Sequence, residues 1–351
     1  MKQMLGYTGT TLTRIAARAL IFRDRKASAS RASWSIVQSL MVVSMIGGCT
    51  SKPMGYVMMP DEEMALAETR AYLDQGGDVN ALVVMPDPGG SDGSCPFAPN
   101  MKATRLLRSA IDGHLQVAEL LIARGADVNA GNDRRLTPLH YAAMMGELSI
   151  ADLLIDSGAE INFRGGNNVT PLISALNAAM EVQLWRDNGD ERPRVGAAMI
   201  RQRRMVFFLV SRGADVNAPP DDGHALEGRP LHLAAELGDV DLMKVMMEKG
   251  APVDTQNKGG QTPLHKAVAY RRLSAAKFLL DRGANPNAEI NAKKYPFWSG
   301  TPLHEAAENG DAKMFDLLVE YGANINAKDA YGRTPVLKAA KTDSSEDHGV
   351  N

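Results

Sequence analysis

The chain has little of what usually staples a small fold or builds a catalytic centre. Cysteine occurs twice in 351 residues, as Cys49 and Cys95, so the sequence holds no disulfide framework. It also contains no glycine-rich phosphate loop, no nucleophile elbow and no spaced cysteine and histidine cluster. We therefore expect stability to come from packing, and we expect no enzymatic activity, cofactor, bound metal or small-molecule substrate.

A long hydrophobic run is missing near the N-terminus, where the apolar stretch at residues 34–46 is too short to span a bilayer comfortably. Residues 1–48 carry seven Lys or Arg against the single acid Asp24, and the small residues Gly47 and Gly48 close this leader. A basic region, a short apolar region and small residues, in that order, are typical of a secretory signal peptide.

The run Ile46-Gly47-Gly48-Cys49 resembles the lipobox of bacterial lipoproteins. The resemblance implies that the Cys49 thiol is diacylated, that residues 1–48 are removed, and that residues 49–60 form a linker. With Thr50 after the cysteine, it implies the outer membrane of the bacterial cell envelope, facing the periplasm. Three acyl chains in total would anchor the protein firmly in the membrane.

Two alternatives remain for this leader, which is long for a signal peptide. A translation start nearer Arg31 would shorten it, or the leader would be a disordered basic segment on a cytoplasmic protein, with Cys49 incidental. Because the whole chain carries a net charge of −2 and the leader +6, the remainder carries −8. Such an acidic surface argues against a nucleic-acid partner.

One phrase recurs along the rest of the chain. Thr137-Pro138-Leu139-His140 returns at Thr262 and at Thr301, and a Gly-Ala pair follows each Thr after 21 positions. The anchor positions are Thr104, Thr137, Thr170, Arg229, Thr262, Thr301 and Thr334, spaced by 33, 33, 59, 33, 39 and 33 residues. A fixed period of this kind predicts stacked structural units.

Each unit is expected to contain two helices. The anchor Thr suits a helix N-cap and the Pro after it suits the first helical position. Before each Gly-Ala pair, apolar residues lie eight, five and four positions back, as Val117, Leu120 and Leu121 do before Gly125. This spacing predicts a second helix with one buried face, ended by the glycine.

The Thr-Pro-Leu-His and Gly-Ala-Asp-Val-Asn-Ala phrases at this period resemble ankyrin repeats over roughly residues 61–341. The resemblance implies an all-α solenoid of helix-turn-helix units with extended loops. The expected units lie near residues 61–81 (a partial cap), 100–130, 133–163, 166–218, 225–255, 258–288, 297–327 and 330–341 (a truncated cap). The polar residues 342–351 are expected to be a disordered tail.

Histidines recur with the phrase, at His140, His232, His265 and His304. In ankyrin repeats this histidine ties the loop together by hydrogen bonds to Thr and backbone, so the resemblance implies a structural role. His224 is a weak candidate for a metal ligand, because no second ligand is suitably spaced.

Three insertions interrupt the period. One is the Pro- and Gly-rich segment 81–103 with Cys95, another is residues 180–204 between the two helices of the third unit, and the last is Lys293 to Trp298. Insertions in repeat proteins map to loops, often on the binding face, but tolerated surface excursions are the alternative. A catalytic site in residues 180–204 is the least favoured hypothesis.

The resemblance also implies that loop tips and the exposed side of the first helices bind another protein. The partner-binding residues expected on this basis are Met144, Met145, Tyr270, Tyr295, Phe297, Trp298, Tyr331 and Arg333. Aromatic residues make up only 5% of the chain, so their gathering at the last loops is notable. Alternatively, Phe297 and Trp298 cover a neighbouring helix.

The function expected from the sequence is therefore an interaction scaffold. We expect it to be anchored through Cys49 and to bind a periplasmic or envelope protein. The alternative is a secreted effector that acts on host proteins.

Overall fold

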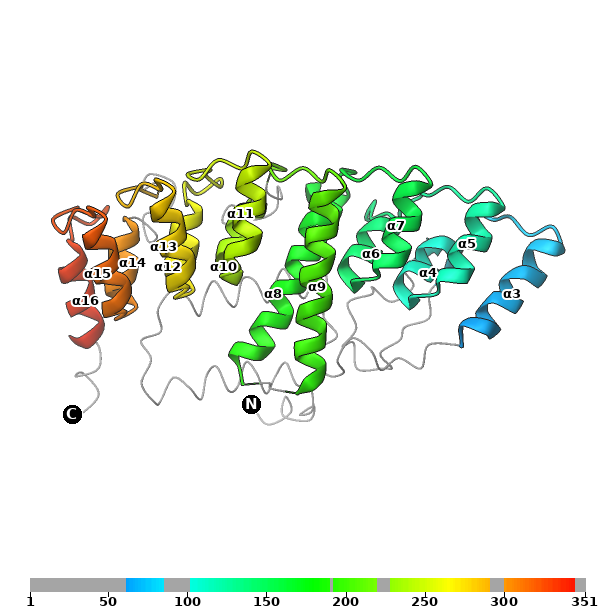
Figure 1. Ribbon diagram of the computed structural model, residues 1–351, viewed down its shortest axis with the longest axis horizontal. Coiled ribbons are helices and arrows are strands. Elements are labelled where there is room, and N and C mark those ends of the chain that lie inside the picture. Colours follow the sequence, from blue (N-terminus) through cyan, green and yellow to red (C-terminus); the bar gives the residue numbers. More distant parts are fainter. Residues whose placement is uncertain (1–60, 85–101, 190–191, 220–227, 291–299, 345–351) are drawn as a thin grey trace, which may run out of the picture. The chain divides into compact units, whose positions relative to one another are not determined.

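The computed structural model describes residues 61–84, 102–189, 192–219, 228–290 and 300–344 (Figure 1). The chain divides into two compact units, residues 1–160 and 161–351. Both units are built from successive helix pairs, and the predicted all-α repeat architecture is confirmed. No helix within these described ranges combines the length and the apolar character that a membrane span requires.

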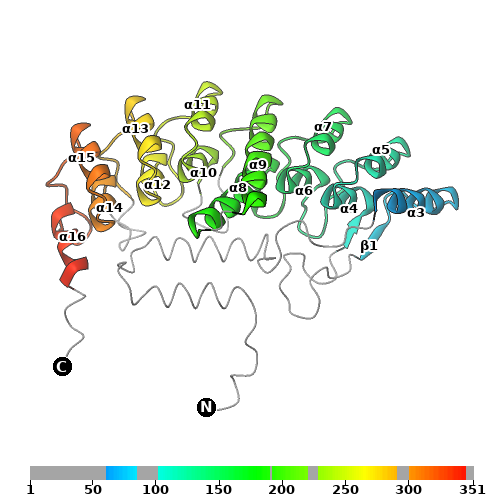
Figure 2. The same ribbon diagram turned by 60° about the horizontal axis from the view of Figure 1, so that its bottom comes forward.

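In the described part of the first unit, two short antiparallel strands separate helix α3 from two helix pairs (Figure 2). Its elements are α3 (Glu62–Asp74), β1 (Leu82–Val84), β2 (Lys102–Thr104), α4 (Arg105–Asp112), α5 (Leu115–Ala123), α6 (Pro138–Met145) and α7 (Leu148–Asp156). Helices α4 and α6 pack side by side, and α5 packs between α3 and α7. Leu82 lies opposite Thr104 in this pair of strands.

The described residues of the second unit form four helix pairs followed by the single helix α16. Its elements are η3 (Gly166–Asn168), α8 (Pro171–Asp187), α9 (Pro193–Ser211), α10 (Pro230–Leu237), α11 (Val240–Glu248), α12 (Pro263–Ala269), α13 (Leu273–Asp281), α14 (Pro302–Glu308), α15 (Ala312–Glu320) and α16 (Pro335–Ser344). The even-numbered helices pack in one row and α9, α11, α13 and α15 in a second row.

The recurring histidine holds the start of each first helix. Nδ1 of His140 accepts a hydrogen bond from the backbone N–H of Thr137 at 3.1 Å, and His265 and His304 do the same for their own anchors. Because Nδ1 is the acceptor, the ring proton is assigned to Nε2. In His232 and His304 this Nε2 donates to a carbonyl oxygen of the following repeat. The predicted structural role of these histidines is confirmed.

The asparagine of the Gly-Ala-Asp-Val-Asn-Ala phrase joins each loop to the next one. In the first unit, Oδ1 of Asn129 accepts from the N–H of Glu160 at 2.9 Å, and its Nδ2 donates to the Gly158 carbonyl at 3.4 Å. In the second unit, Asn287 bonds in the same way to Asn324 and Gly322. The phrase therefore recurs because each repeat completes the hydrogen bonds of the neighbouring repeat.

A single position decides where each first helix ends. Nine residues after the anchor, Gly146 and Gly238 have φ of 76° and 75°, a left-handed conformation that stops a helix and favours glycine. Arg271 takes the same position with φ of 55°. In the repeat that begins at Thr170, the residue at this position is Ala179, which stays helical, and α8 runs on to Asp187.

The interpretation of residues 180–204 as an insertion between two helices is therefore corrected. The added residues lengthen both helices, so that α8 has 17 residues and α9 has 19, against 8 in α10 and 9 in α11. The extension adds about two and a half turns to each helix. The repeat that begins at Thr170 thus carries a helical hairpin where a surface loop was expected.

Candidate protein-interaction surfaces

Met144 and Met145 end α6 in the first unit, and they differ in exposure. The side chain of Met144 is only 9% exposed, so it offers little surface to a partner, contrary to the expectation of an exposed contact residue. Met145 is partly exposed. The reason is positional, because the seventh residue after the anchor packs toward the neighbouring first helix.

The second unit shows what this seventh position does. Glu236 on α10 forms an ion pair with Lys266 on α12 at 2.5 Å, and Glu308 on α14 forms one with Lys338 on α16 at 2.8 Å. All four side chains are largely buried. In both pairs the glutamate precedes the lysine by 30 residues, a spacing that is visible in the sequence. These carboxylates join neighbouring repeats and do not face a partner protein.

Among the predicted contacts that the structure describes, the most exposed is Tyr331, in the loop before α16. Its side chain is 50% exposed, and the guanidinium of Arg333 lies 4.9 Å from its ring centroid. Arg333 also forms an ion pair with Asp329 at 2.6 Å, and Asp329 accepts the backbone N–H of Tyr331. Tyr331 and Arg333 therefore form one ordered loop tip.

Tyr270 lies on a different loop, directly after α12. Its backbone N–H donates to the carbonyl oxygen of Lys266 at 3.1 Å, and its side chain is partly exposed. The other predicted functional residues lie outside the described residues, and their assigned roles stay predictions. These are Cys49, Tyr295, Phe297 and Trp298, together with Cys95 and His224.

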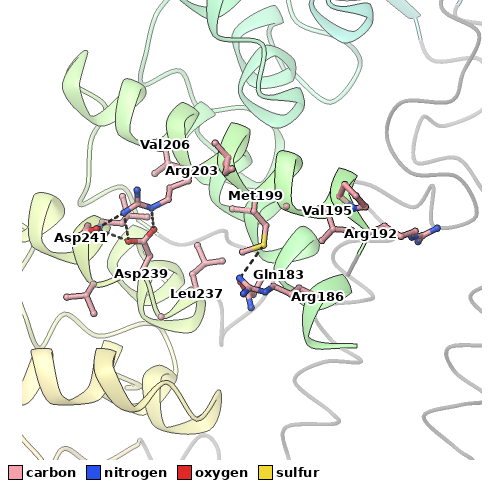
Figure 3. Close-up of a pocket in the computed structure, with 17 residues that line it drawn as sticks. Gln183, Arg186, Arg192, Val195, Met199, Arg203, Val206, Leu237, Asp239 and Asp241 are labelled. Atoms are coloured by element: carbon pink, nitrogen blue, oxygen red, sulfur yellow. Dashed lines mark hydrogen bonds and ion pairs between the residues drawn. The ribbon is translucent and has the colours of Figure 1, made fainter. Parts of the chain in front are cut away.

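A second surface, which the sequence did not predict, lies beside the hairpin extension. A groove of about 820 Å³ runs between α8 and α9 on one side and the turn between α10 and α11 on the other (Figure 3). Its apolar lining includes Val195, Met199, Ile200, Leu237 and Val240. Ile200 is 63% exposed, which is unusual for an isoleucine near the middle of a helix.

Charged side chains border the same groove. Arg203 on α9 pairs with Asp239 at 2.6 Å and with Asp241 at 2.7 Å, both at the start of α11 (Figure 3). At the end of α8, Arg186 is exposed, and its Nη1 lies 3.8 Å from the sulfur of Met199. The groove therefore has one end where Arg203 faces two carboxylates and a cationic end at Arg186.

A buried carboxyl lies where the α8 extension begins. Glu181 is 8% exposed, and its burial raises the pKa to about 7. Burial also lowers the pKa of His232 to about 3 and that of His265 to about 4, so both rings are neutral at physiological pH. Within the part of the chain that the structure describes, no group of three or more metal-ligating side chains lies together.

Comparison with known proteins agrees with the architecture. A family model described as ankyrin repeats in three copies matches residues 79–181 and 195–290, and a model of the single ankyrin repeat matches residues 300–330. The fold and these matches define a helical repeat protein of the interaction-module class. The chain belongs to the ankyrin-repeat family.

Individual relatives share only the repeats. Human ankyrin repeat and SOCS box protein 11 is 31% identical over 117 residues, which are 33% of this chain and 34% of that protein. The mouse B-cell lymphoma 3 protein homolog is 31% identical over 140 residues, which are 40% of this chain and 30% of that protein. The chain therefore matches about a third of the length of these relatives.

Solved structures show the same fold. The ankyrin repeat domain of human ASB11 aligns with a TM-score of 0.51 at 24% identity, covering 71% of this chain and all of that domain. The ankyrin repeat domain of Bcl-3 aligns with a TM-score of 0.51 at 25% identity, covering 68% of this chain and 94% of that domain. Ankyrin repeats bind other proteins, and this chain is such an interaction scaffold.

Proposed function

We propose that this protein is an ankyrin-repeat lipoprotein of the bacterial cell envelope that binds a periplasmic or envelope protein. The repeat scaffold with an ordered, exposed loop tip at Tyr331 and Arg333 carries the binding part of the proposal. The anchoring part is supported by the signal-like leader and the lipobox-like run that ends at Cys49. We place the protein at the outer membrane, facing the periplasm.

The proposed binding surface combines the loop after α12 with the loops before α14 and α16. It includes Tyr270, Tyr331 and Arg333 of the described residues, together with Tyr295, Phe297 and Trp298 of the loop insertion. Tyr, Trp and Arg dominate the energetics of many interfaces when they are centrally buried by the partner. An interface of about 1,200–2,000 Å² would be ordinary for a surface of this kind.

The anchor is tested by the substitution Cys49→Ala. In cells that express the full chain, we expect the native protein to take up labelled fatty acid and to fractionate with the outer membrane, and the variant to lose both properties. Equal fractionation and no label in either protein would reject the anchor. A soluble product recovered outside the producing cell would instead support the alternative of a secreted effector.

The binding surface is tested with a captured partner. We expect Trp298→Ala and Tyr331→Ala each to weaken partner binding by more than about 1 kcal/mol without changing the melting curve. The control is Val319→Ala, because Val319 is 39% exposed on α15, in the second row of helices. Unchanged affinity for both loop-tip variants, with unchanged melting, would place the binding surface elsewhere.

A further inference from the structure

We propose that the groove beside the α8–α9 extension binds a peptide segment of a partner protein in which acidic residues flank apolar ones. The inference rests on the proposed function, because it takes the partner to be a protein. The inference adds a second contact surface, on a helical hairpin that the other described repeats lack. It also states the chemistry of the segment that this surface recognises.

Two arginines join the two sides of the groove. Arg272, at the start of α13, pairs with Asp187 at the end of α8 at 2.7 Å and also donates to the Glu236 carbonyl at the end of α10. Arg203 also crosses between the two sides, because it fixes α9 to the start of α11 through Asp239 and Asp241. A site fixed in advance loses less conformational entropy when a ligand binds.

The floor of the groove presents an apolar stripe. Gly196, Met199, Ile200 and Arg203 line it from α9 at helical i, i+3, i+4 and i+7 spacing, and Leu237 and Val240 line it from the opposite side. A Cβ at Gly196 would meet nothing within 4 Å, so the groove is open at this end of the stripe. Such a stripe, rimmed by charge, matches the recognition of a helix or extended segment through its alternate apolar side chains.

The charge of the groove selects an acidic segment. Three arginines line the groove, Arg186, Arg192 and Arg203, against the two carboxylates of Asp239 and Asp241, which both contact Arg203, so the lining carries a net charge of 3 − 2 = +1. Arg186 lies in the last turn of α8, and within the described ranges its guanidinium contacts the Met199 sulfur and no carboxylate. A guanidinium in this setting binds a carboxylate in two-pronged geometry.

The contrast with the rest of the chain strengthens this assignment. Beyond residue 48 the chain carries a net charge of −8, so an acidic segment is repelled by most of the surface and attracted where arginines gather. A lipid surface fits less well, since the apolar side chains line a concave groove, whereas a membrane contact needs them on a protruding surface.

The experiment selects peptides from a phage-displayed library of random 12-residue sequences against the full chain. We expect enriched peptides to combine Asp or Glu with apolar residues, and to lose about tenfold or more in affinity for Arg186→Glu and for Ile200→Glu. The matched control is Arg204→Glu, an exposed arginine on α9 outside the groove lining, for which we expect less than about a twofold change. Replacing the peptide carboxylates by lysines should restore binding to Arg186→Glu.

Several outcomes would overturn the inference. These are the enrichment of no peptide, enrichment without acidic residues, equal affinity for the groove variants and the control, or Arg186-dependent binding of phosphatidylglycerol vesicles without peptide binding. Circular dichroism melts confirm folding, and Arg186→Gln serves as a milder variant. If the captured partner is lost with Tyr331→Ala but kept with Arg186→Glu, the proposed function stands and only the groove assignment fails.

Discussion

The neighbouring helix pairs α8–α9 and α10–α11 begin with related sequence and end differently. Both first helices start at a proline after the anchor residue, and their first eight residues occupy matching positions. At the ninth position after the anchor, Gly238 turns the chain into α11, whereas Ala179 continues the helix. The two pairs therefore differ in the residue at this position and in the 26 added residues that lengthen α8 and α9.

The two regions also differ in what holds them to their neighbours. The ordinary first helices are joined by buried ion pairs, such as Glu236 with Lys266. The hairpin is braced by ion pairs that are far more exposed, those of Arg203 and Arg272. Buried and exposed ion pairs respond very differently to the loss of one partner, so substitutions distinguish the two kinds of contact.

The largest effect is expected where a buried pair is broken. Glu236→Ala leaves the Lys266 ammonium buried without its carboxylate, which should lower the free energy of unfolding by about 3–5 kcal/mol. Glu236→Leu combined with Lys266→Met should restore most of this loss. Urea denaturation of both variants provides the measurement, and a loss below about 1 kcal/mol for the single substitution would contradict the assignment.

The next effect concerns Glu181 at the base of the hairpin. Its pKa of about 7 in the folded chain exceeds its ordinary value of 4.5, so the folded state holds the proton more tightly than the unfolded state. Its stabilising contribution is complete below about pH 4.5 and is lost as the pH rises to 7. Relative to Glu181→Gln, the native chain should lose about 3 kcal/mol between pH 4.5 and pH 8.

Comparison with the variant is needed because the buried histidines act in the opposite sense. The pKa values of His232 and His265 are lowered on folding, so these residues remove stability as the pH falls below about 6.5. Both chains retain these histidines, and their contribution cancels in the difference. A stability difference that does not change with pH would show that Glu181 is not buried as described.

A smaller effect follows from exchanging the residues at the ninth position. Gly238→Ala imposes a left-handed φ of 75° on alanine, and its Cβ would lie 3.0 Å from the Cδ of Arg272. We expect a loss of about 1–2 kcal/mol. Ala179→Gly should cost about 1 kcal/mol, as glycine does inside a helix. Thermal melts report both changes, and a gain in stability from either would argue against this explanation of the hairpin.

The smallest effect is expected at the exposed brace. Arg203→Ala removes the contacts with Asp239 and Asp241 on the surface and should lower the free energy of unfolding by less than about 1 kcal/mol. Added salt should reduce the difference further. A loss as large as that of Glu236→Ala would mean that the hairpin and the ordinary pairs are held in the same way.

Much of the fold could be predicted from the sequence because the repeats state the same local rules several times. Thr137 and His140 illustrate this, since their hydrogen bonds recur wherever the phrase does. The helical hairpin was missed because an insertion was equated with a loop, although the absence of glycine at Ala179 was visible. The burial of Met144 and the ion pair of Glu236 with Lys266 depend on contacts between neighbouring repeats. The sequence pattern of a single repeat does not contain these contacts.

The candidate surfaces were less predictable than the fold for the same reason. Tyr331 and Arg333 are close in sequence, and the structure places them together in one loop tip. The groove, in contrast, combines Arg186, Met199 and Leu237 from three helices whose packing follows from the length of α8. No local sequence motif predicts a site of this kind.

Arg272 gives the second unit a link that ordinary repeat stacking lacks. Through Asp187 it connects the third helix pair of this unit to the first, past the intervening pair α10–α11. Most repeat arrays behave as chains of nearest-neighbour couplings and can be peeled one unit at a time. In a one-dimensional description of the array, this exposed ion pair adds a second-neighbour coupling of less than about 1 kcal/mol.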